Sequence, residues 1–551
     1  MRRTSSYLCA VMLVTTSAAL GQSANLLKVT ILNDSDAYSD NQVYVQMLGL
    51  DPSGTGNNGH VDLATSTWVA ISESDNTVVP PGGPWSHPTY TGYALKLSEL
   101  TPEGLHTYSF NMPHIISGRI YVSFEQPAYF HVNPGPALEE PSAVDPTLPN
   151  YPLIFDKIEL DWQNGQDPFL NTTTVDFFSI SFMLDLNLLD GTSMSRGFTL
   201  PRGAIMGNLQ ALPAPWQYGM VQNGSTAVRF VAPNKLADTS PFAGYFDSYV
   251  NTCWNYYTTN LLTLTSLPNS PAWSATGQVV AGVFTFTVGG TGETVTINNL
   301  AGQSAHIFGC DGPGYLFTTG SDSIGKQGII TTMGAALNRG VLYDGQSGIP
   351  DTAAWWNDPS LFYAQSPTNS YSKVLHEAAY QGFCYGFSFD DVGGFSTGVQ
   401  GNAAEAVITI QAMSDQPVVH TVDIKPNKTQ FSTTDTIVIL VDVTQAIPTP
   451  FYPGFYLTLP SGQRLYLTEG NRLTPTASAY LQRKRRKKYV PVQITVPGAE
   501  SNLQLFSASF RNIPAGNYVL QGGAVNAQTP FLNGDINWIA NAEDTEVLRV
   551  R

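Results

Sequence analysis

The sequence predicts a mainly β chain in which a β-sandwich is followed by a smaller mixed α/β part and then by an immunoglobulin-like β-sandwich. Only 12% of the 551 residues are charged, while 49 are glycine and 37 are proline, which disfavours coiled coils and long solvated helices. Apolar residues make up 42% of the chain, which disfavours disorder. Short apolar runs bounded by Gly, Pro, Asn and Asp are typical of strands joined by turns.

Residues 1–21 predict a secretory signal peptide. A basic start at Arg2 and Arg3 precedes an apolar run over residues 7–14, and Ala19 and Gly21 are small residues suited to a cleavage site. The apolar run is too short to span a bilayer. No later stretch of 18 residues is apolar, so we expect an exported chain, extracellular or in the cell wall, that is not inserted in a membrane.

Residues 26–200 form the first predicted sandwich. Strand-like runs lie at residues 28–32, 43–48, 119–124 and 177–184, and turn-forming residues separate them. We expect these strands to supply the core of the sandwich.

Residues 201–415 predict a mixed part. Helical spacing of apolar residues is found over 323–337 and 372–380, and Ser240-Pro241 is a suitable start for a helix that runs toward residue 257. Residues 277–298 return to alternating strands. Together, residues 26–415 form the predicted catalytic region.

Residues 416–551 predict the second sandwich. Strand-like segments follow one another at 422–424, 436–443, 454–459, 489–496, 503–510 and 518–525, a spacing typical of immunoglobulin-like domains. A run of six cations at residues 483–488 interrupts them. A solvated hairpin tip, adhesion to an anionic surface and a processing site are the open interpretations of this run.

The net charge of −16 makes a nucleic-acid partner improbable, because contacts to phosphates need a basic face. The negative charge is confined to the first part of the chain. Residues 416–551 carry 13 lysines and arginines against 9 aspartates and glutamates, whereas residues 22–415 carry 11 against 33. No motif for a nucleotide or a metal is complete, and we expect neither a metal nor an organic cofactor.

Two carboxylates in residues 155–182 are candidates for a catalytic pair. Apolar residues at 158, 160 and 162 alternate with polar ones, so Glu159 should point away from the core. Asp176 shares its side-chain parity with apolar residues at 178, 180 and 182, where an ionised carboxylate needs a compensating partner. A hairpin that turned at Asp167-Pro168 would place Glu159 opposite Asp176, and two carboxylates so close would shift each other's pKa. One raised and one normal pKa is what general acid/base chemistry at a glycosidic bond requires. The parities differ, however, so a bulge or a non-adjacent pairing is needed, and a purely structural pair stays open.

Several ordered motifs carry a resemblance to a known family. They are VNPGPAL at 132–138, EPS at 140–142, FDKIELDW at 155–162, VDF at 175–177, HIFGC at 306–310, ALNR at 336–339, NSYS at 369–372 and YGFSFDDV at 385–392. Over residues 26–415 the chain resembles glycoside hydrolase family 64, the thaumatin-like β-1,3-glucanases of the laminaripentaose-producing type. The resemblance implies a thaumatin-like β-sandwich with a smaller mixed domain.

The resemblance also implies a reaction, the inverting endo-hydrolysis of β-1,3-glucan. By position, Glu159 is the expected general acid and Asp176 the expected general base that activates water. An inverting pair needs carboxyl groups about 6.5–9.5 Å apart, against about 5–5.5 Å for retention. The simple hairpin favours the shorter separation and the resemblance the wider one, which we expect.

Six further residues are implied as substrate contacts. Asp161, Gln163 and Thr173 stand where the family contacts sugar, although the first two are larger or more charged than expected there. Arg119, Asp390 and Asp391 resemble the charged cleft residues of thaumatin-like folds, and a structural salt bridge is the alternative.

The expected partner is β-1,3-glucan, and we expect the chain to act as a monomer. Two other interpretations stay open. One is a non-catalytic β-glucan-binding protein of the cell wall. The other is an adhesin or structural wall protein that attaches through residues 416–551.

Overall fold

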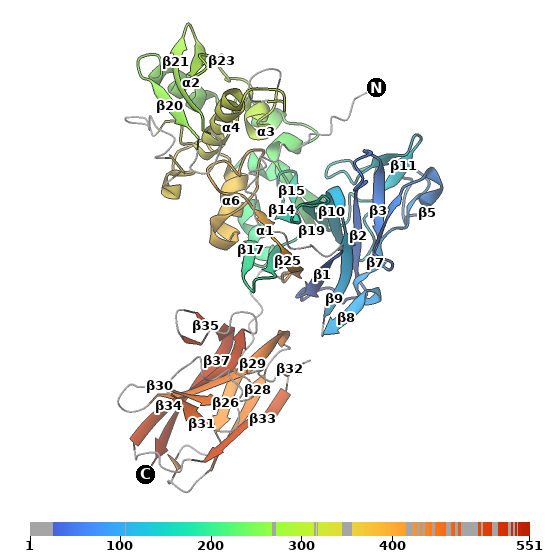
Figure 1. Cartoon of the computed structure of the whole chain (residues 1–551), viewed down its shortest axis with the longest axis vertical. Helices are drawn as coiled ribbons and strands as arrows, with labels where there is room; N and C mark the ends of the chain where they lie inside the picture. The colour runs from blue at the N-terminus through green and yellow to red at the C-terminus, as the bar shows by residue number, and fades with distance from the viewer. Residues whose placement is uncertain are drawn as a thin grey trace. The chain divides into compact units, whose positions relative to one another are not determined.

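A computed structural model of the chain describes residues 26–414, except residue 105 and the segments 267–271, 313–315, 317, 344–354 and 357, and also the strands found between residues 422 and 550 (Figure 1). The predicted signal peptide and the basic run at 483–488 lie outside the described residues. The chain divides into two compact units, and along the sequence the division falls between Asp415 and Gln416.

The first unit contains a β-sandwich of two sheets (Figure 1). One sheet has the order β17 (Ser193–Gly197), β16 (Phe182–Leu188), β25 (Ala403–Ile410), β1 (Leu26–Asn33), β9 (Thr107–Pro113) and β8 (Thr101–Gly104). The other has the order β24 (Gly398–Gln400), β14 (Phe169–Thr172), β13 (Phe155–Trp162), β10 (Ile115–Phe124), β2 (Val43–Leu50), β3 (Asn58–Asp62) and β4 (Thr67–Ala70), with β7 (Leu95–Lys96) also paired to β2.

Alternation along the strands builds the core between the sheets. Val29 and Ile31 of β1 and Ile120 and Val122 of β10 are fully buried in one hydrophobic cluster, because every second side chain of a strand faces the same way. The strands predicted at 28–32, 43–48 and 119–124 are confirmed as parts of β1, β2 and β10.

One strand of the sandwich comes from the far end of the unit. β25 lies between β1, with which it pairs in parallel, and β16, with which it pairs antiparallel. The prediction that the sandwich is built from residues 26–200 alone is therefore wrong. Parallel pairing needs a long crossover connection, and here residues 34–402, with most of the sandwich strands and the mixed part, lie between the two strands.

The mixed part carries the helices, namely α1 (Arg202–Gln210), α2 (Asp247–Tyr256), α3 (Ser304–Gly309), α4 (Ile324–Arg339) and α6 (Ser370–Ala378). The predicted helices at 323–337 and 372–380 are confirmed as α4 and α6. Ser323 caps α4 by accepting from the Lys326 N–H, and Asn369 caps α6 in the same way. The helix predicted from Ser240 to Tyr257 is wrong in its first part, where a 3₁₀ turn (Ser240–Phe242) precedes α2.

Two smaller sheets complete the mixed part. One has the order β15 (Phe177–Phe178), β19 (Thr226–Val231) and β18 (Met220–Asn223), and the other runs from β20 (Leu262–Thr265) through β21 (Ser274–Val280) and β22 (Val283–Val288) to β23 (Thr294–Ile297). The last three strands confirm the alternation predicted over 277–298. Cys253, Cys310 and Cys384 are all buried free thiols.

The segment 177–182, predicted as part of one strand, is interrupted. β15 ends at Phe178 and β16 begins at Phe182, while the residues between them are buried on all sides. The Asp156 carboxylate stabilises this interruption of the strand, because it accepts hydrogen bonds from the N–H groups of Ser179 at 2.8 Å and Ile180 at 2.9 Å. Burial raises the pKa of Asp156 to about 6, although these N–H groups oppose the rise.

Asp156→Asn should destabilise the first unit by about 2 kcal/mol, because an amide turns its NH₂ group toward backbone N–H donors that then lack an acceptor. Urea unfolding followed by tryptophan fluorescence measures the loss. The control is Asp190→Asn in an exposed turn, where we expect a change within about 0.5 kcal/mol. Equal midpoints for the two variants would contradict the role given to Asp156.

The second unit is described by its strands alone. One sheet has the order β26 (Val422–Pro426), β28 (Thr436–Val443) and β33 (Glu500–Ser509). The main path of the other is β27 (Gln430–Phe431), β37 (Trp538–Val550), β34 (Gly516–Asn526), β29 (Ile447–Thr458), β30 (Arg464–Thr468) and β31 (Arg472–Thr474), and β32 (Ile494–Val496) pairs with β29. The predicted β character is confirmed, and the immunoglobulin-like arrangement stays a prediction.

Within the part of the chain that the structure describes, no helix combines the length and the apolar character needed to cross a bilayer.

Candidate active site

The outer face of β13 carries the first candidate. Ile158, Leu160 and Trp162 are buried, as the alternation predicts, and Glu159 lies on the opposite face with 29% of its side chain exposed. Lys157 and Asp161 share that outer face, since they are two residues away on the same strand. The prediction that Glu159 points away from the core is confirmed.

Glu159 has a cross-strand neighbour on each side. Arg119 of β10 lies opposite it in one direction and Asn171 of β14 in the other. The Arg119 Nε lies 3.8 Å from the Glu159 Oε1. The Asn171 Oδ1 is buried and accepts no hydrogen bond from the described residues, so an acceptor next to Glu159 stays unused.

Glu140 holds Arg119 from the other side. Its Oε1 lies 2.5 Å from the Arg119 Nη1, and its Oε2 accepts from the Tyr121 hydroxyl at 3.0 Å. Burial opposes the charge of Arg119, but Tyr121, Glu140 and Glu159 outweigh it and raise the pKa of Arg119 above its ordinary value. The guanidinium is therefore a permanent cation between two carboxylates.

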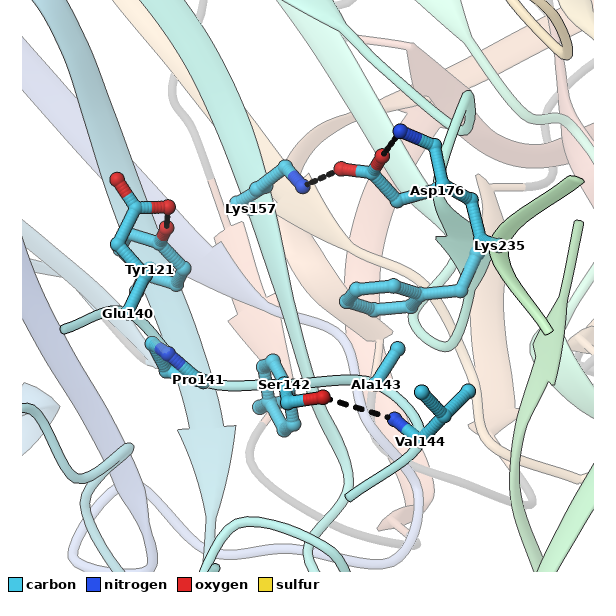
Figure 2. A pocket seen from close by; sticks show the side chains of 11 residues that line it. Tyr121, Glu140, Pro141, Ser142, Ala143, Val144, Lys157, Asp176 and Lys235 are labelled. Carbon is cyan, nitrogen blue, oxygen red and sulfur yellow. Dashed lines mark hydrogen bonds and ion pairs between the residues drawn. The ribbon is translucent and has the colours of Figure 1, made fainter. Parts of the chain in front are cut away.

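Asp176 lies immediately before β15, and two ammonium groups hold it (Figure 2). Its Oδ2 is 2.5 Å from the Lys157 Nζ, and its Oδ1 is 3.1 Å from the Lys235 Nζ. Burial alone raises the pKa of a carboxyl, but the two lysines outweigh burial and hold the pKa of Asp176 well below its ordinary value. The two lysines therefore favour the ionised form of Asp176.

A polar pocket of about 210 Å³ opens beside this carboxylate (Figure 2). Its lining comes from β10, from β13, from the 140–144 segment and from the turn that bears Lys235. The lining residues are Tyr121, Glu140, Pro141, Ser142, Ala143, Val144, Phe155, Lys157, Asp176, Phe177 and Lys235.

Lys157 links the two predicted catalytic carboxylates. Burial disfavours its charge, but the nearby Asp176 and Glu159 outweigh burial and raise the pKa of Lys157. The structure therefore gathers Arg119, Glu140, Lys157, Glu159, Asp176 and Lys235 into one charged cluster, here called the carboxylate cluster.

The predicted hairpin turn at Asp167-Pro168 is wrong. β13 and β14 turn earlier, at Gly165, which has a φ of 78°, and this register pairs Glu159 with Asn171 instead of Asp176. Asp176 reaches the cluster from a separate segment after β14. The parity argument for Asp176 fails as well, because the residues after it do not form one continuous strand.

The predicted sugar contacts on β13 and β14 have structural partners. Asp161 accepts from the Ser117 N–H at 2.9 Å and from the Gln163 side chain at 2.9 Å, so it fixes the bulge of β10 next to Ser117. Thr173 is only 6% exposed, which leaves little of it to touch a ligand.

Asp390 does not lie on an open surface, which corrects its prediction as a cleft residue. It is 0% exposed, and its carboxylate accepts hydrogen bonds from Arg339 at 3.0 Å and from the Ser372 hydroxyl at 2.9 Å. The His376 Nε2 also lies 2.9 Å from this carboxylate. The alternative of a structural salt bridge is therefore the correct one for Asp390. Asp391 is exposed in the same turn.

Sequence reasoning missed Glu140, Tyr121, Lys157 and Lys235 as members of the site. Lys157 carried a signal, since it shares the outer face of its strand with Glu159. Lys235 carried none, because it follows a different strand, β19, far along the chain.

Comparisons with known proteins agree over the first unit. Residues 25–410 match the model of glycoside hydrolase family 64, described as β-1,3-glucanase. A glucan endo-1,3-β-glucosidase of Cellulosimicrobium cellulans is 27% identical over 299 residues, and one of Arthrobacter sp. (strain YCWD3) is 28% identical over 299 residues. Each match covers 54% of this chain and 52% of the relative, so the chain spans about half the length of these relatives.

Two solved structures share the fold. A β-1,3-glucanase domain from Clostridium beijerinckii is 27% identical, with a TM-score of 0.58 over 70% of this chain and 98% of that domain. A laminaripentaose-producing β-1,3-glucanase in complex with laminaritetraose is 25% identical, with a TM-score of 0.58 over 71% of this chain and 100% of the other. The resemblance seen in the sequence motifs is confirmed, and the chain belongs to glycoside hydrolase family 64, the β-1,3-glucanases.

Proposed function

We propose that the chain is an exported endo-β-1,3-glucanase that inverts the anomeric centre, with Glu159 as general acid and Asp176 as general base. The observation that carries the proposal is the unlike surroundings of the two carboxylates in one cluster. Asp176 forms short ion pairs with two ammonium groups, whereas Glu159 has a longer contact of 3.8 Å with a guanidinium that Glu140 also holds. Carboxylates in unlike surroundings are what acid/base chemistry at a glycosidic bond requires.

The reaction assigns one proton transfer to each carboxyl group. Glu159 in its protonated form donates to the glycosidic oxygen as the bond to the anomeric carbon breaks. Asp176 takes a proton from a water that attacks the opposite face of the sugar ring, so the new hydroxyl has the inverted configuration. The site then returns to its starting state when the proton moves from Asp176 to Glu159 through solvent.

The family and the composition support β-1,3-glucan as the proposed substrate. Curated relatives are named as glucan endo-1,3-β-glucosidases, and one structural neighbour is described with laminaritetraose bound. A neutral polysaccharide presents hydroxyl groups, and a chain with few charges and many neutral polar residues suits it. Export through the predicted signal peptide would bring the enzyme to such a polymer.

Incubation with laminarin and curdlan tests the proposal. Reducing ends should appear together with short oligosaccharides, and proton NMR in the first minutes should show the α-anomer at the newly formed ends. A β-anomer formed first would contradict the inverting mechanism. If neither glucan were hydrolysed, the proposal that the chain is an enzyme would be wrong.

One observation favours a second function, that of a glucan-binding protein without catalysis. Both oxygens of Asp176 are already bonded to ammonium groups, which makes the carboxylate a weak base in this conformation. Binding to curdlan without hydrolysis, and unchanged by Asp176→Asn, would identify the second function.

A further inference from the structure

The two lysines that hold Asp176 differ in how firmly they are placed. Lys157 extends from the middle of β13, its side chain is only 9% exposed, and its Nζ lies 5.2 Å from the centre of the Phe177 ring. Lys235 ends a short 3₁₀ turn (Pro233–Lys235), and 38% of its side chain is exposed. One ammonium group is locked into the sheet, and the other borders solvent.

The turn that bears Lys235 is attached to the backbone of Asp176. The Ala232 N–H donates to the Asp176 carbonyl at 3.0 Å, and the Lys235 N–H donates to the Ala232 carbonyl at 2.9 Å. This short path directs the Lys235 side chain back over the carboxylate of the residue that anchors the turn. The placement of Lys235 is therefore a property of the local fold and not of a chance surface contact.

A base must attract the proton of water. Each oxygen of Asp176 keeps a second lone pair, but the ammonium groups on both oxygens stabilise its negative charge and make it a weak base, so the opening of one contact strengthens the base. If Lys157 lost its contact with Asp176, a buried ammonium group would be left without its closest partner, whereas Lys235 can turn into solvent at little cost.

We propose that Lys235 is a displaceable positioning residue that masks Asp176 in the free enzyme and moves off its Oδ1 when glucan binds, while Lys157 stays as the fixed partner. The inference rests on the proposed function, because it describes how the base becomes available. No bond other than this ion pair changes, and Lys235 keeps its proton throughout. The departure of one cation also makes Asp176 more basic at the moment when it must accept a proton.

Other ionisable groups near Asp176 set the background for any titration. Those that interact with it or share its pocket are Arg119, Tyr121, Glu140, Lys157, Lys235 and Tyr371. Substitutions at Lys235 leave the other five in place, so a change in titration reports on Lys235.

The test compares Lys235→Met, Lys235→Arg and the control Lys373→Met, which removes an exposed lysine of α6. The readout is the ¹³C NMR titration of the Asp176 carboxyl group, which Asp176→Asn assigns. We expect its midpoint to rise by about one pH unit in Lys235→Met and to stay in place in Lys235→Arg and in the control. An unmoved midpoint in Lys235→Met would overturn the inference.

Kinetics supply a second readout. In Lys235→Met, kcat on laminarin near neutral pH should exceed that of the wild type, because no ammonium group has to leave. In the double variant Lys157→Met/Lys235→Met, Asp176 is buried without either cation, and its pKa should rise. The acid limb of the pH profile, where kcat/KM falls as Asp176 is protonated, should therefore appear above about pH 4. A tenfold loss of kcat in Lys235→Met without movement of the acid limb would assign Lys235 a different role.

The two proposals fail in different ways. If the wild type hydrolyses no glucan while the Asp176 titration moves as expected, the proposed function falls and the masking contact stands. If the wild type is active and the Asp176 titration does not respond to Lys235, the masking contact falls and the function stands.

Discussion

Glu159→Gln should lower kcat/KM on laminarin by about a hundred- to ten-thousand-fold, because glutamine keeps the size of the side chain but has no proton to give to the leaving oxygen. Stability should hardly change, since Glu159 is partly exposed and its nearest cationic atom, the Arg119 Nε, is 3.8 Å away. The measurement is release of reducing ends over time, together with thermal melting of both proteins. Equal rates for the variant and the wild type would remove Glu159 from the role of acid.

A matched experiment separates the acid from the base. Asp176→Ala should also lose at least a hundredfold in rate, but added azide should restore turnover, because this anion attacks the anomeric carbon without losing a proton. The product should be an α-glycosyl azide, as inversion of a β-linkage demands. Glu159→Gln lacks the acid and not the nucleophile, so azide should leave its rate low.

Asp390→Asn should destabilise the first unit by about 3–5 kcal/mol, the range found when one partner of a buried ion pair is removed. Asp390 is fully buried, and its carboxylate accepts from Arg339, Ser372 and the Gly386 N–H. Arg339 is buried as well, so the variant leaves a guanidinium without a compensating charge. Equilibrium unfolding in urea measures the loss.

The pH dependence of this loss has a definite sign. Burial raises the pKa of Asp390, but His376 and Arg339 outweigh burial and place it below the ordinary value. A group whose pKa is lower in the folded state contributes stability above its unfolded pKa of about 3.9, and loses it as the pH falls through the folded value. The difference between wild type and Asp390→Asn should therefore be full at pH 7 and shrink below about pH 4.

Asp391→Asn is the control, since Asp391 is the exposed neighbour in the same turn. We expect a change within about 0.5 kcal/mol. If Asp390→Asn were as stable as this control and lost only activity, the residue would belong to the site and not to the fold.

Local patterns predicted the parts of the site that lie within one strand. The alternation around Glu159 fixed its face, and the same pattern already put Lys157 beside it. Asp176 was found by the family motif, whereas the pairing proposed for it was wrong, because the true hairpin turns at Gly165 and uses Asn171.

Contacts between distant segments stayed beyond prediction. Lys235 reaches Asp176 because the turn after β19 is anchored at Ala232, and no sequence period encodes such a contact. Asp390 gave the opposite error. The resemblance to thaumatin-like folds implied a charged cleft residue, but burial with Arg339 depends on how α4 and α6 pack.

The place of β25 has a consequence for how the chain acquires its structure. Among the described residues, β1 is the first strand to leave the ribosome, yet one of its two edges stays open until residues 403–410 have been made. The sheet therefore cannot close during most of translation, and its completion is a late, long-range event of the kind that slows folding. The first sheet of this unit therefore stays incomplete until nearly all of the unit has been synthesised.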